Sequence, residues 1–134
     1  MAKVLSVKYP WCVYIIYGSK DVENRIWKHP PKYRGRLYIH CGKQPDMGAR
    51  IPVGANKKEE LQLFVNIPNL AFDNIAGKII GYVELDDMKH ESDSPWYTGD
   101  LALMFSNPVA LLEPIPYRGQ LGFFNVDNAL LGIE

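Results

Sequence analysis

The chain has 134 residues, of which 47% are apolar and 22% charged, and its formal net charge is zero. A chain of this length is expected to form one domain, residues 1–134, that buries about two-thirds of the surface of its unfolded form. No apolar run reaches the roughly 18 residues of a membrane span, and residues 1–8 lack the apolar core of a secretion signal. We therefore expect a cytoplasmic protein with no membrane partner.

The charges are divided unevenly along the chain. Residues 1–58 contain 12 of the 15 Lys and Arg side chains but three acids, whereas residues 59–134 contain three bases and 12 acids. Such asymmetry is typical of a chain with a basic nucleic-acid surface. It is equally expected of a fold that interleaves the two halves and joins them by ion pairs, so both interpretations stay open.

The two cysteines, Cys12 and Cys41, have no C-x-x-C spacing and no paired histidines around them. This pattern favours two reduced, buried thiols over a disulfide or a zinc site. We expect neither a metal nor a cofactor.

The first two predicted elements are a strand at residues 3–7 and a helix at residues 10–17. Pro10 suits the first turn of the helix, where its missing N–H leaves nothing unpaired, and Gly18 suits the position after the last turn. The helix is apolar nearly all round, which predicts that it is largely buried.

The octet GSKDVENR, residues 18–25, places five charged or amide side chains directly after this apolar helix, namely Lys20, Asp21, Glu23, Asn24 and Arg25. We expect a strand at residues 21–27, whose period of two puts Glu23 and Arg25 on the same face. Lys20 can join them only from the turn that follows the helix. The octet therefore predicts that these three side chains converge on one concave surface.

The rest of the chain alternates between short apolar segments and connections rich in Gly and Pro. A helix of about ten residues should start at Asn56, with Leu61, Phe64 and Val65 on its apolar face, and end before Pro68. Residues 42–56 form an irregular connection, long enough to suggest a functional or mobile loop. Further strands are expected at residues 36–41, 77–87, 101–105, 109–112 and 122–126. This order predicts an α+β domain whose sheet curls into a small barrel.

These segments resemble the ASCH domain, a branch of the PUA-like superfamily. The octet matches the family signature G-x-K-x-x-E-x-R, and the match extends to four longer blocks in the family's order: YPWCVYIIYG before the octet, then RIWKHPPKYRGRLYIHCGK, IIGYVELDD and SPWYTGDLALMFSNPVALLEPIPYRGQLGFFNV after it. The resemblance implies a pseudo-barrel of five or six strands with helices packed at its ends, and a cleft lined by the octet. Relatives are regarded as RNA- or nucleic-acid-binding modules, and some small ones hydrolyse acetylated cytidine or have been linked to RNA cleavage.

Such a cleft suits a nucleobase or a short single strand. Lys20 and Arg25 can bind phosphate, and Glu23 can accept a hydrogen bond from an exocyclic amine. Tryptophans are candidates to stack a base. The predicted binding residues are Lys8, Trp11, Lys20, Glu23, Arg25, Trp27, Arg34, Arg36 and Trp96, with Lys28 and Lys32 along the ligand path.

Structural roles compete with these assignments. Glu23 and Arg25 can simply form an ion pair that orders the strand, and each tryptophan can pack in the core, Trp11 above all. We expect His40 to be a satisfied residue of the barrel, and His29 and His90 to be solvated.

Catalysis is the second hypothesis. The cytidine amidohydrolases of the family resemble one another in carrying Thr where this chain has Glu23, and they use it beside the octet lysine and a distant glutamate. The only threonine here is Thr98, far along the chain. Lys20 and Glu23, or Glu84 as the distant carboxylate, can activate a water if burial keeps the lysine partly neutral. We rank binding of RNA or a modified nucleoside first. Metal-independent hydrolysis, with Lys20 and Glu23 as catalytic residues, is second. A protein-interaction module is third, and it would be favoured if side chains fill the cleft.

Overall fold

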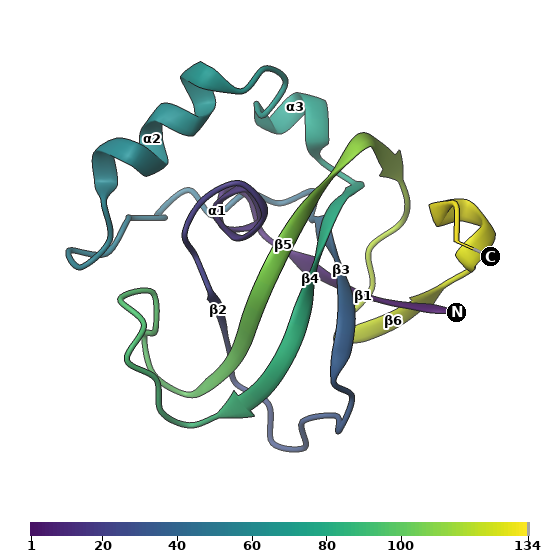
Figure 1. Cartoon of the computed structure of the whole chain (residues 1–134), viewed down its shortest axis with the longest axis horizontal. Coiled ribbons are helices and arrows are strands. Elements are labelled where there is room, and N and C mark those ends of the chain that lie inside the picture. The colour runs from purple at the N-terminus through teal and green to yellow at the C-terminus, as the bar shows by residue number, and fades with distance from the viewer. Residues whose placement is uncertain (134) are drawn as a thin grey trace.

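The computed structural model describes residues 1–133, which form one six-stranded sheet with short helices beside it (Figure 1). In chain order the elements are β1 (Ala2–Val7), α1 (Trp11–Ile16), β2 (Val22–Arg25), β3 (Gly35–Cys41), α2 (Lys57–Asn66), α3 (Phe72–Ile75), β4 (Lys78–Lys89), β5 (Leu101–Pro116), β6 (Phe123–Val126) and the 3-10 helix η1 (Asn128–Leu131). None of the helices in this described part of the chain is long and apolar enough to cross a membrane.

The strand order in the sheet is β2-β5-β4-β3-β1-β6, and β1 and β3 are the one parallel pair among the described strands. The sheet curls around α1, which packs against β3, β4 and β5, while α2 and α3 arch over one end (Figure 1). Five of the six α1 residues are buried, as the all-round apolar sequence predicts. The expected α+β pseudo-barrel is thus confirmed.

The barrel is not closed by strand pairing, because β2 and β6 are the two free edges of the sheet. Side chains bridge the gap instead. Arg25 Nη2 on β2 donates a hydrogen bond of 2.9 Å to the carbonyl oxygen of Ser6 on β1. The Trp27 ring meets the ring of Phe123, on β6, edge to face with 5.4 Å between centroids. Arg25 and Trp27 therefore help to hold the two edges together.

The prediction of separate strands at residues 101–105 and 109–112 is wrong, because β5 is continuous through Asn107 and Pro108. The register between β4 and β5 shifts at this point, since Tyr82 pairs with Val109 but Glu84 pairs with Ser106. Asn107, with φ of 51°, and Pro108 form the extra residues of this irregularity. A bulge needs no ladder hydrogen bond from the proline, so the strand passes through it.

The helix start at Asn56 is confirmed, since its side chain accepts a hydrogen bond of 3.1 Å from the Glu59 amide. The predicted apolar face is confirmed at Phe64, which packs against the core, and is wrong at Leu61 and Val65, which are 47% and 83% exposed. The helix also turns Glu60, which is 3% exposed, toward the interior. The carboxylate of Glu60 accepts hydrogen bonds from the amide and hydroxyl of Ser19, and this polar contact fixes the rotation of the helix.

Other boundaries differ by a few residues. β2 spans residues 22–25 within the predicted 21–27, and β4 continues two residues beyond the predicted end at Asp87. Neither α3 nor η1 is predicted, because an element of four residues is too short to show a period. Cys12 and Cys41 are both buried free thiols, as expected.

Candidate nucleic-acid or nucleoside site

A cavity of about 1290 Å³ opens between the octet, the end of β1, and two loops on either side. The loop after β3 supplies residues 42–52 of its lining, and the segment after β5 supplies residues 116–122. Its charged lining is mostly basic: Lys8, Lys20, Arg25, Lys43, Arg50 and Arg118 face only two carboxylates, Glu23 and Asp46.

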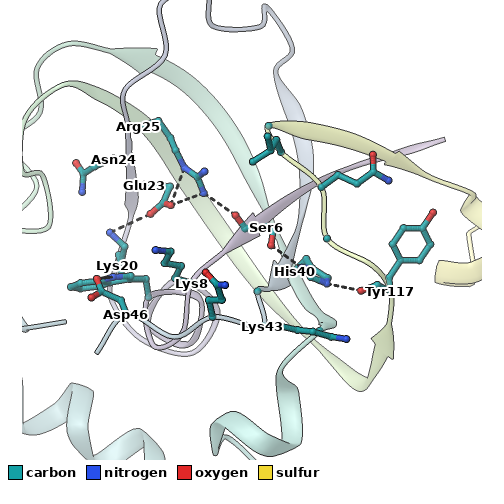
Figure 2. A pocket seen from close by; sticks show the side chains of 18 of the residues that line it. Ser6, Lys8, Lys20, Glu23, Asn24, Arg25, His40, Lys43, Asp46 and Tyr117 are labelled. Carbon is teal, nitrogen blue, oxygen red and sulfur yellow. Dashed lines mark hydrogen bonds and ion pairs between the residues drawn. The ribbon is translucent and has the colours of Figure 1, made fainter. Parts of the chain in front are cut away.

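Lys20, Glu23 and Arg25 converge on one wall of this cavity (Figure 2). Lys20 Nζ lies 3.8 Å from Glu23 Oε1, while Arg25 donates a hydrogen bond of 3.1 Å from Nε to Glu23 Oε2 and places Nη2 2.9 Å from the same oxygen as an ion pair. Lys20 lies in the turn before β2, where its amide donates to the Tyr14 carbonyl of α1. The predicted convergence is confirmed. The ion pair between Glu23 and Arg25 also exists, so the two roles coincide.

Lys20 is the most confined charge of the cavity, with 4% of its surface exposed. Its ammonium lies 5.3 Å from the Trp11 ring centroid and 5.7 Å from that of Trp96. Burial lowers the pKa of Lys20, and the neighbouring carboxylates of Glu23 and Asp21 oppose this shift. At a given pH a larger fraction of this lysine is therefore neutral than of a solvated one.

A second polar cluster lies on the opposite wall (Figure 2). Ser6 Oγ is 2.9 Å from His40 Nδ1, and His40 Nε2 is 2.7 Å from the carbonyl oxygen of Tyr117. Burial lowers the pKa of His40. His40 is satisfied on both nitrogens, as the sequence predicts, but it also borders the cavity, which the sequence does not indicate. Because Arg25 donates to the Ser6 carbonyl, one network runs from Lys20 to Tyr117.

Four bases of the cavity, Lys8, Lys43, Arg50 and Arg118, are exposed, and within residues 1–133 none of them forms an ion pair. This part of the chain contains four ion pairs. A single one of them, between Arg34 and Asp87, joins the basic half of the chain, residues 1–58, to the acidic half. Interleaving of the halves therefore does not neutralise the basic residues, and the cavity keeps an excess of positive charge.

Several residues predicted to bind the ligand lie elsewhere. Arg34 pairs with Asp87 at 3.2 Å, and the Arg36 guanidinium lies over the Tyr82 ring at 4.2 Å. Lys28 and Lys32 are also absent from the cavity lining, as is Trp27. Arg34 and Arg36 lie outside the cavity because they stand at the start of β3, against β4, whereas the other end of β3, with His40, borders it.

The other two tryptophans do line the cavity, but neither offers a free face in this structure. Trp96 is only 2% exposed and packs against Tyr14, with ring centroids 5.4 Å apart. Trp11 is half-buried, and its indole N–H donates to Asp46 Oδ2 at 2.8 Å. Since Lys20 lies against both rings, their main observed role is to enclose the ammonium.

Sequence reasoning missed other parts of the site. Asn24 donates to the Trp96 carbonyl and accepts from the Thr98 amide, and this clamp brings the chain's single threonine to the cavity wall. Glu84, the suggested distant carboxylate, is not in the lining, whereas Asp46 is. The one available signal was the unusual length of the connection at residues 42–56. No group of three or more His, Cys, Asp or Glu side chains in the described residues is placed to hold a metal ion.

Comparisons with known proteins agree with this fold. The chain is 28% identical to human activating signal cointegrator 1 and 27% identical to the mouse protein, in each case across 94% of its own length. It spans about a fifth of the length of these curated relatives, 22%. No family model matches the chain.

Solved structures give the same result. Crystal structures of the ASCH protein from Zymomonas mobilis, in unmodified form and as a single-residue mutant, match at a TM-score of 0.54 and 13% identity. The match covers 98% of this chain and 91–92% of those chains. The shared fold, the octet and the similarity along nearly the whole length together support an ASCH-domain protein.

Proposed function

We propose that residues 1–134 form a single nucleic-acid-binding module whose cavity accepts a nucleobase with its phosphate, presented by a short single-stranded RNA. The observation that carries this proposal is the excess of basic side chains around a cavity of about 1290 Å³. This volume exceeds the roughly 300–1,000 Å³ of most small-molecule pockets, so it leaves space for more than one nucleotide unit. The cytoplasm remains the compartment expected from the sequence.

Phosphate recognition is assigned to the exposed bases Lys43, Arg50 and Arg118, together with Lys8. They have no acidic partner in residues 1–133, so a bound phosphate does not compete with an existing ion pair. Arg25 is assigned a smaller part than the sequence suggested, because its guanidinium is already bonded to Glu23 and to the Ser6 carbonyl.

Glu23 is assigned to the base. Arg25 occupies its Oε2 with a hydrogen bond from Nε and an ion-pair contact from Nη2, whereas the nearest cation to Oε1 is Lys20 at 3.8 Å, beyond hydrogen-bond distance. A carboxylate oxygen has two lone pairs, so Oε1 can accept from an exocyclic amine such as that of cytosine or adenine. The third hypothesis, a protein-interaction module, is favoured if side chains fill the cleft. The cavity is open, so we do not adopt that hypothesis.

Hydrolysis of an acylated nucleoside is the second candidate, and one observation favours it. The buried ammonium of Lys20, with its lowered pKa, lies beside a carboxylate at the cavity wall. Such a pair is suited to activate a water. The position that holds Thr in the amidohydrolase relatives holds Glu23 here, so we rank binding first.

The test is a binding measurement with fluorescent single-stranded RNA octamers of mixed sequence, and with cytidine and cytidine monophosphate as small ligands. Lys43→Glu combined with Arg118→Glu should weaken RNA binding more than tenfold, because both side chains line the cavity. The matched control is Arg34→Glu combined with Arg36→Glu, which removes the same charge from outside the cavity and should change affinity less than twofold. Equal losses from the two double variants, or no RNA binding by the folded wild type, would overturn the proposal.

Glu23→Gln separates binding from catalysis. If the cavity only binds, this change should reduce affinity by about 1–3 kcal/mol, as expected for the loss of one charge-assisted hydrogen bond. If the chain deacetylates acetylcytidine, the same change should lower the rate by about 10²–10⁴-fold. Turnover by the wild type that is lost in Lys20→Ala would reverse our ranking, and activity gained only in Glu23→Thr would show that the wild type lacks a nucleophile at this position.

A further inference from the structure

Ser6 and His40 form a hydroxyl–imidazole pair that the octet does not include. Ser6 is a half-buried residue near the end of β1, and His40 lies near the end of the parallel strand β3, so the sheet holds both groups rigidly. The two residues pair directly in the register of these strands. Both side chains border the cavity.

The hydrogen bonds determine which nitrogen of His40 carries the proton. The carbonyl oxygen of Tyr117 can only accept, so the Nε2 atom 2.7 Å away must carry hydrogen. Nδ1 of the neutral ring then has a free lone pair and accepts the proton of the Ser6 hydroxyl at 2.9 Å. The Phe124 ring packs edge to face against the imidazole, with centroids 6.2 Å apart, and fixes its plane. This arrangement is a serine with an oriented base beside it.

We propose that Ser6 and His40 form a nucleophilic dyad that hydrolyses carboxylic esters whose alcohol part carries an anionic group. Serine is a weak nucleophile until an adjacent base removes its proton, and a base is effective when a third group orients it. Here the Tyr117 carbonyl is the orienting group. The lowered pKa of the imidazole keeps it in the basic form at neutral pH. The inference concerns turnover, and it holds whether or not the cavity binds nucleic acid.

The surroundings of the dyad determine its substrate class. Arg25 Nη2 is already bonded to the carbonyl of Ser6, so the guanidinium contributes a fixed positive charge near the serine, whose field favours negative charge on the acyl oxygen without a hydrogen bond to it. The exposed Lys43 lies near His40 (Figure 2), and Arg118, also exposed and in the cavity lining, directly follows Tyr117 in the chain, so both favour an anionic leaving group. A neutral carbonyl stabilises an imidazolium less than a carboxylate does, so esters, with their better leaving groups, are favoured over amides.

The reaction needs water as its only co-reactant. The Ser6 oxygen bonds to the acyl carbon while its proton passes to His40 Nδ1, and the same proton then goes to the departing alcohol oxygen as the ester C–O bond breaks. Water next gives a proton to Nδ1 and bonds to the acyl carbon, the acyl–serine bond breaks, and the Ser6 oxygen takes the proton back. One ester and one water become one carboxylic acid and one alcohol.

Gly119 limits the space over the dyad. A methyl group at this position would lie 2.9 Å from His40 Cε1 and 3.1 Å from Ser6 Oγ, closer than ordinary van der Waals contact. Gly119→Ala should therefore obstruct the nucleophile without removing either reacting group. This variant tests whether a substrate must reach Ser6, and it leaves both reacting side chains unchanged.

The experiment is labelling of the intact chain by an alkyl fluorophosphonate, followed by peptide mass spectrometry. In wild type we expect one label, on Ser6, and labelling of His40→Gln slower by about 10²–10⁴-fold. Ser106→Ala and His90→Gln, which remove a serine and an exposed histidine outside the cavity, are the matched controls and should label like wild type. Absence of label from Ser6 in a folded wild-type chain, or labelling unaffected by His40→Gln, would overturn the proposal. A merely structural hydrogen bond gives no label.

Turnover tests the substrate class with a matched pair of esters, 4-acetoxybenzoate and its neutral methyl ester. The wild type should hydrolyse the anionic ester at least about tenfold faster, and Ser6→Ala and Gly119→Ala should both lose this activity. The labelling result needs no variant that removes Ser6, so it decides the case even where Ser6→Ala fails to fold. Equal rates for the two esters would contradict the assignment of an anionic substrate.

Discussion

Glu23 holds the ionic wall of the cavity together, because it is the shared partner of two cations. Its Oε2 pairs with the Arg25 guanidinium, which donates a hydrogen bond from Nε, and its Oε1 faces the buried ammonium of Lys20. Breaking a buried pair from one side leaves a charge without compensation, which costs more than the pair itself contributes. The effect of a mutation at Glu23 therefore depends on whether Lys20 is still charged.

A double-mutant cycle measures this dependence. Glu23→Gln should lower the free energy of unfolding by about 3 kcal/mol, the lower end for breaking a buried pair. In a Lys20→Met background the same change should cost about 1–2 kcal/mol less, within the range of coupling between contacting residues. Urea unfolding followed by circular dichroism gives all four values. The exposed pair Lys89 and Asp87 is the control and should show coupling near zero; equal coupling in both pairs would contradict burial of Lys20 as the cause.

His40 gives the folded chain a pH dependence whose sign follows from its environment. Burial is the main cause that lowers its pKa, with a smaller contribution from the charge of Lys43, while hydrogen bonds to the backbone of Tyr117 and Gly77 act in the opposite direction. The unfolded state, with a histidine pKa of about 6.5, then binds the proton more readily than the folded state. Stability should fall as the pH drops below about 6.5 and should be recovered as the pH rises.

The measurement is the urea midpoint between pH 8 and pH 5 for wild type, His40→Gln and His90→Gln. The glutamine at position 40 keeps one donor and one acceptor but does not titrate, so the loss of stability toward acid pH should become shallower. His90→Gln, at an exposed site, should retain the slope of the wild type. An unchanged slope in His40→Gln would assign the acid sensitivity to other groups.

The elements follow local sequence where apolar residues determine them and depart from it where polar contacts do. The burial of α1, the start of α2 at Asn56 and the strand of the octet could all be predicted, because each depends on residues within one or two turns. The rotation of α2 could not, since Ser19 binds Glu60 from 41 positions away. The continuity of β5 through Pro108 also depends on pairing with β4, which no local pattern contains.

Gly18 tests this contact between α2 and the turn after α1. It was predicted as a helix-ending glycine, but its φ is not positive, and its lack of a side chain serves close packing instead. A methyl group there would lie 2.0 Å from Glu60 Oε2, so Gly18→Ala should lower the free energy of unfolding by about 1–3 kcal/mol. Glu60→Ala should cost less in the Gly18→Ala background than in wild type. Gly48→Ala, where the nearest atom is 3.7 Å away, is the control and should be close to neutral in urea unfolding.

At the scale of the whole molecule, the cavity combines parts that the sequence could and could not place. The octet residues could be predicted because three of them are within six positions of one another. The two halves of the Ser6–His40 pair are 34 positions apart, and Lys43, Arg50 and Arg118 reach the cavity from loops whose paths depend on the assembled sheet. The uneven charge along the chain signalled a basic surface. Of the bases predicted to form it, Lys8, Lys20 and Arg25 line the cavity, whereas Lys28, Lys32, Arg34 and Arg36 lie outside it.

The salt dependence of RNA binding tests this basic surface as a whole. Each phosphate neutralised by a base releases counterions, so log K should fall with log salt by roughly 0.7 per contact on a single strand. With the four exposed bases of the cavity engaged, we expect a slope of about −3 for an RNA octamer. Arg118→Gln should make this slope shallower by about 0.7, whereas Arg34→Gln should leave it unchanged.

Fluorescence anisotropy between 50 and 300 mM potassium chloride (about a sixfold range) is sufficient to measure these slopes. Cytidine carries no phosphate, so its binding should be insensitive to salt over the same range. If the affinity for the octamer does not change with salt, a single nucleoside unit is held by the cavity wall at Glu23, and the exposed bases around the cavity make no contact with the strand.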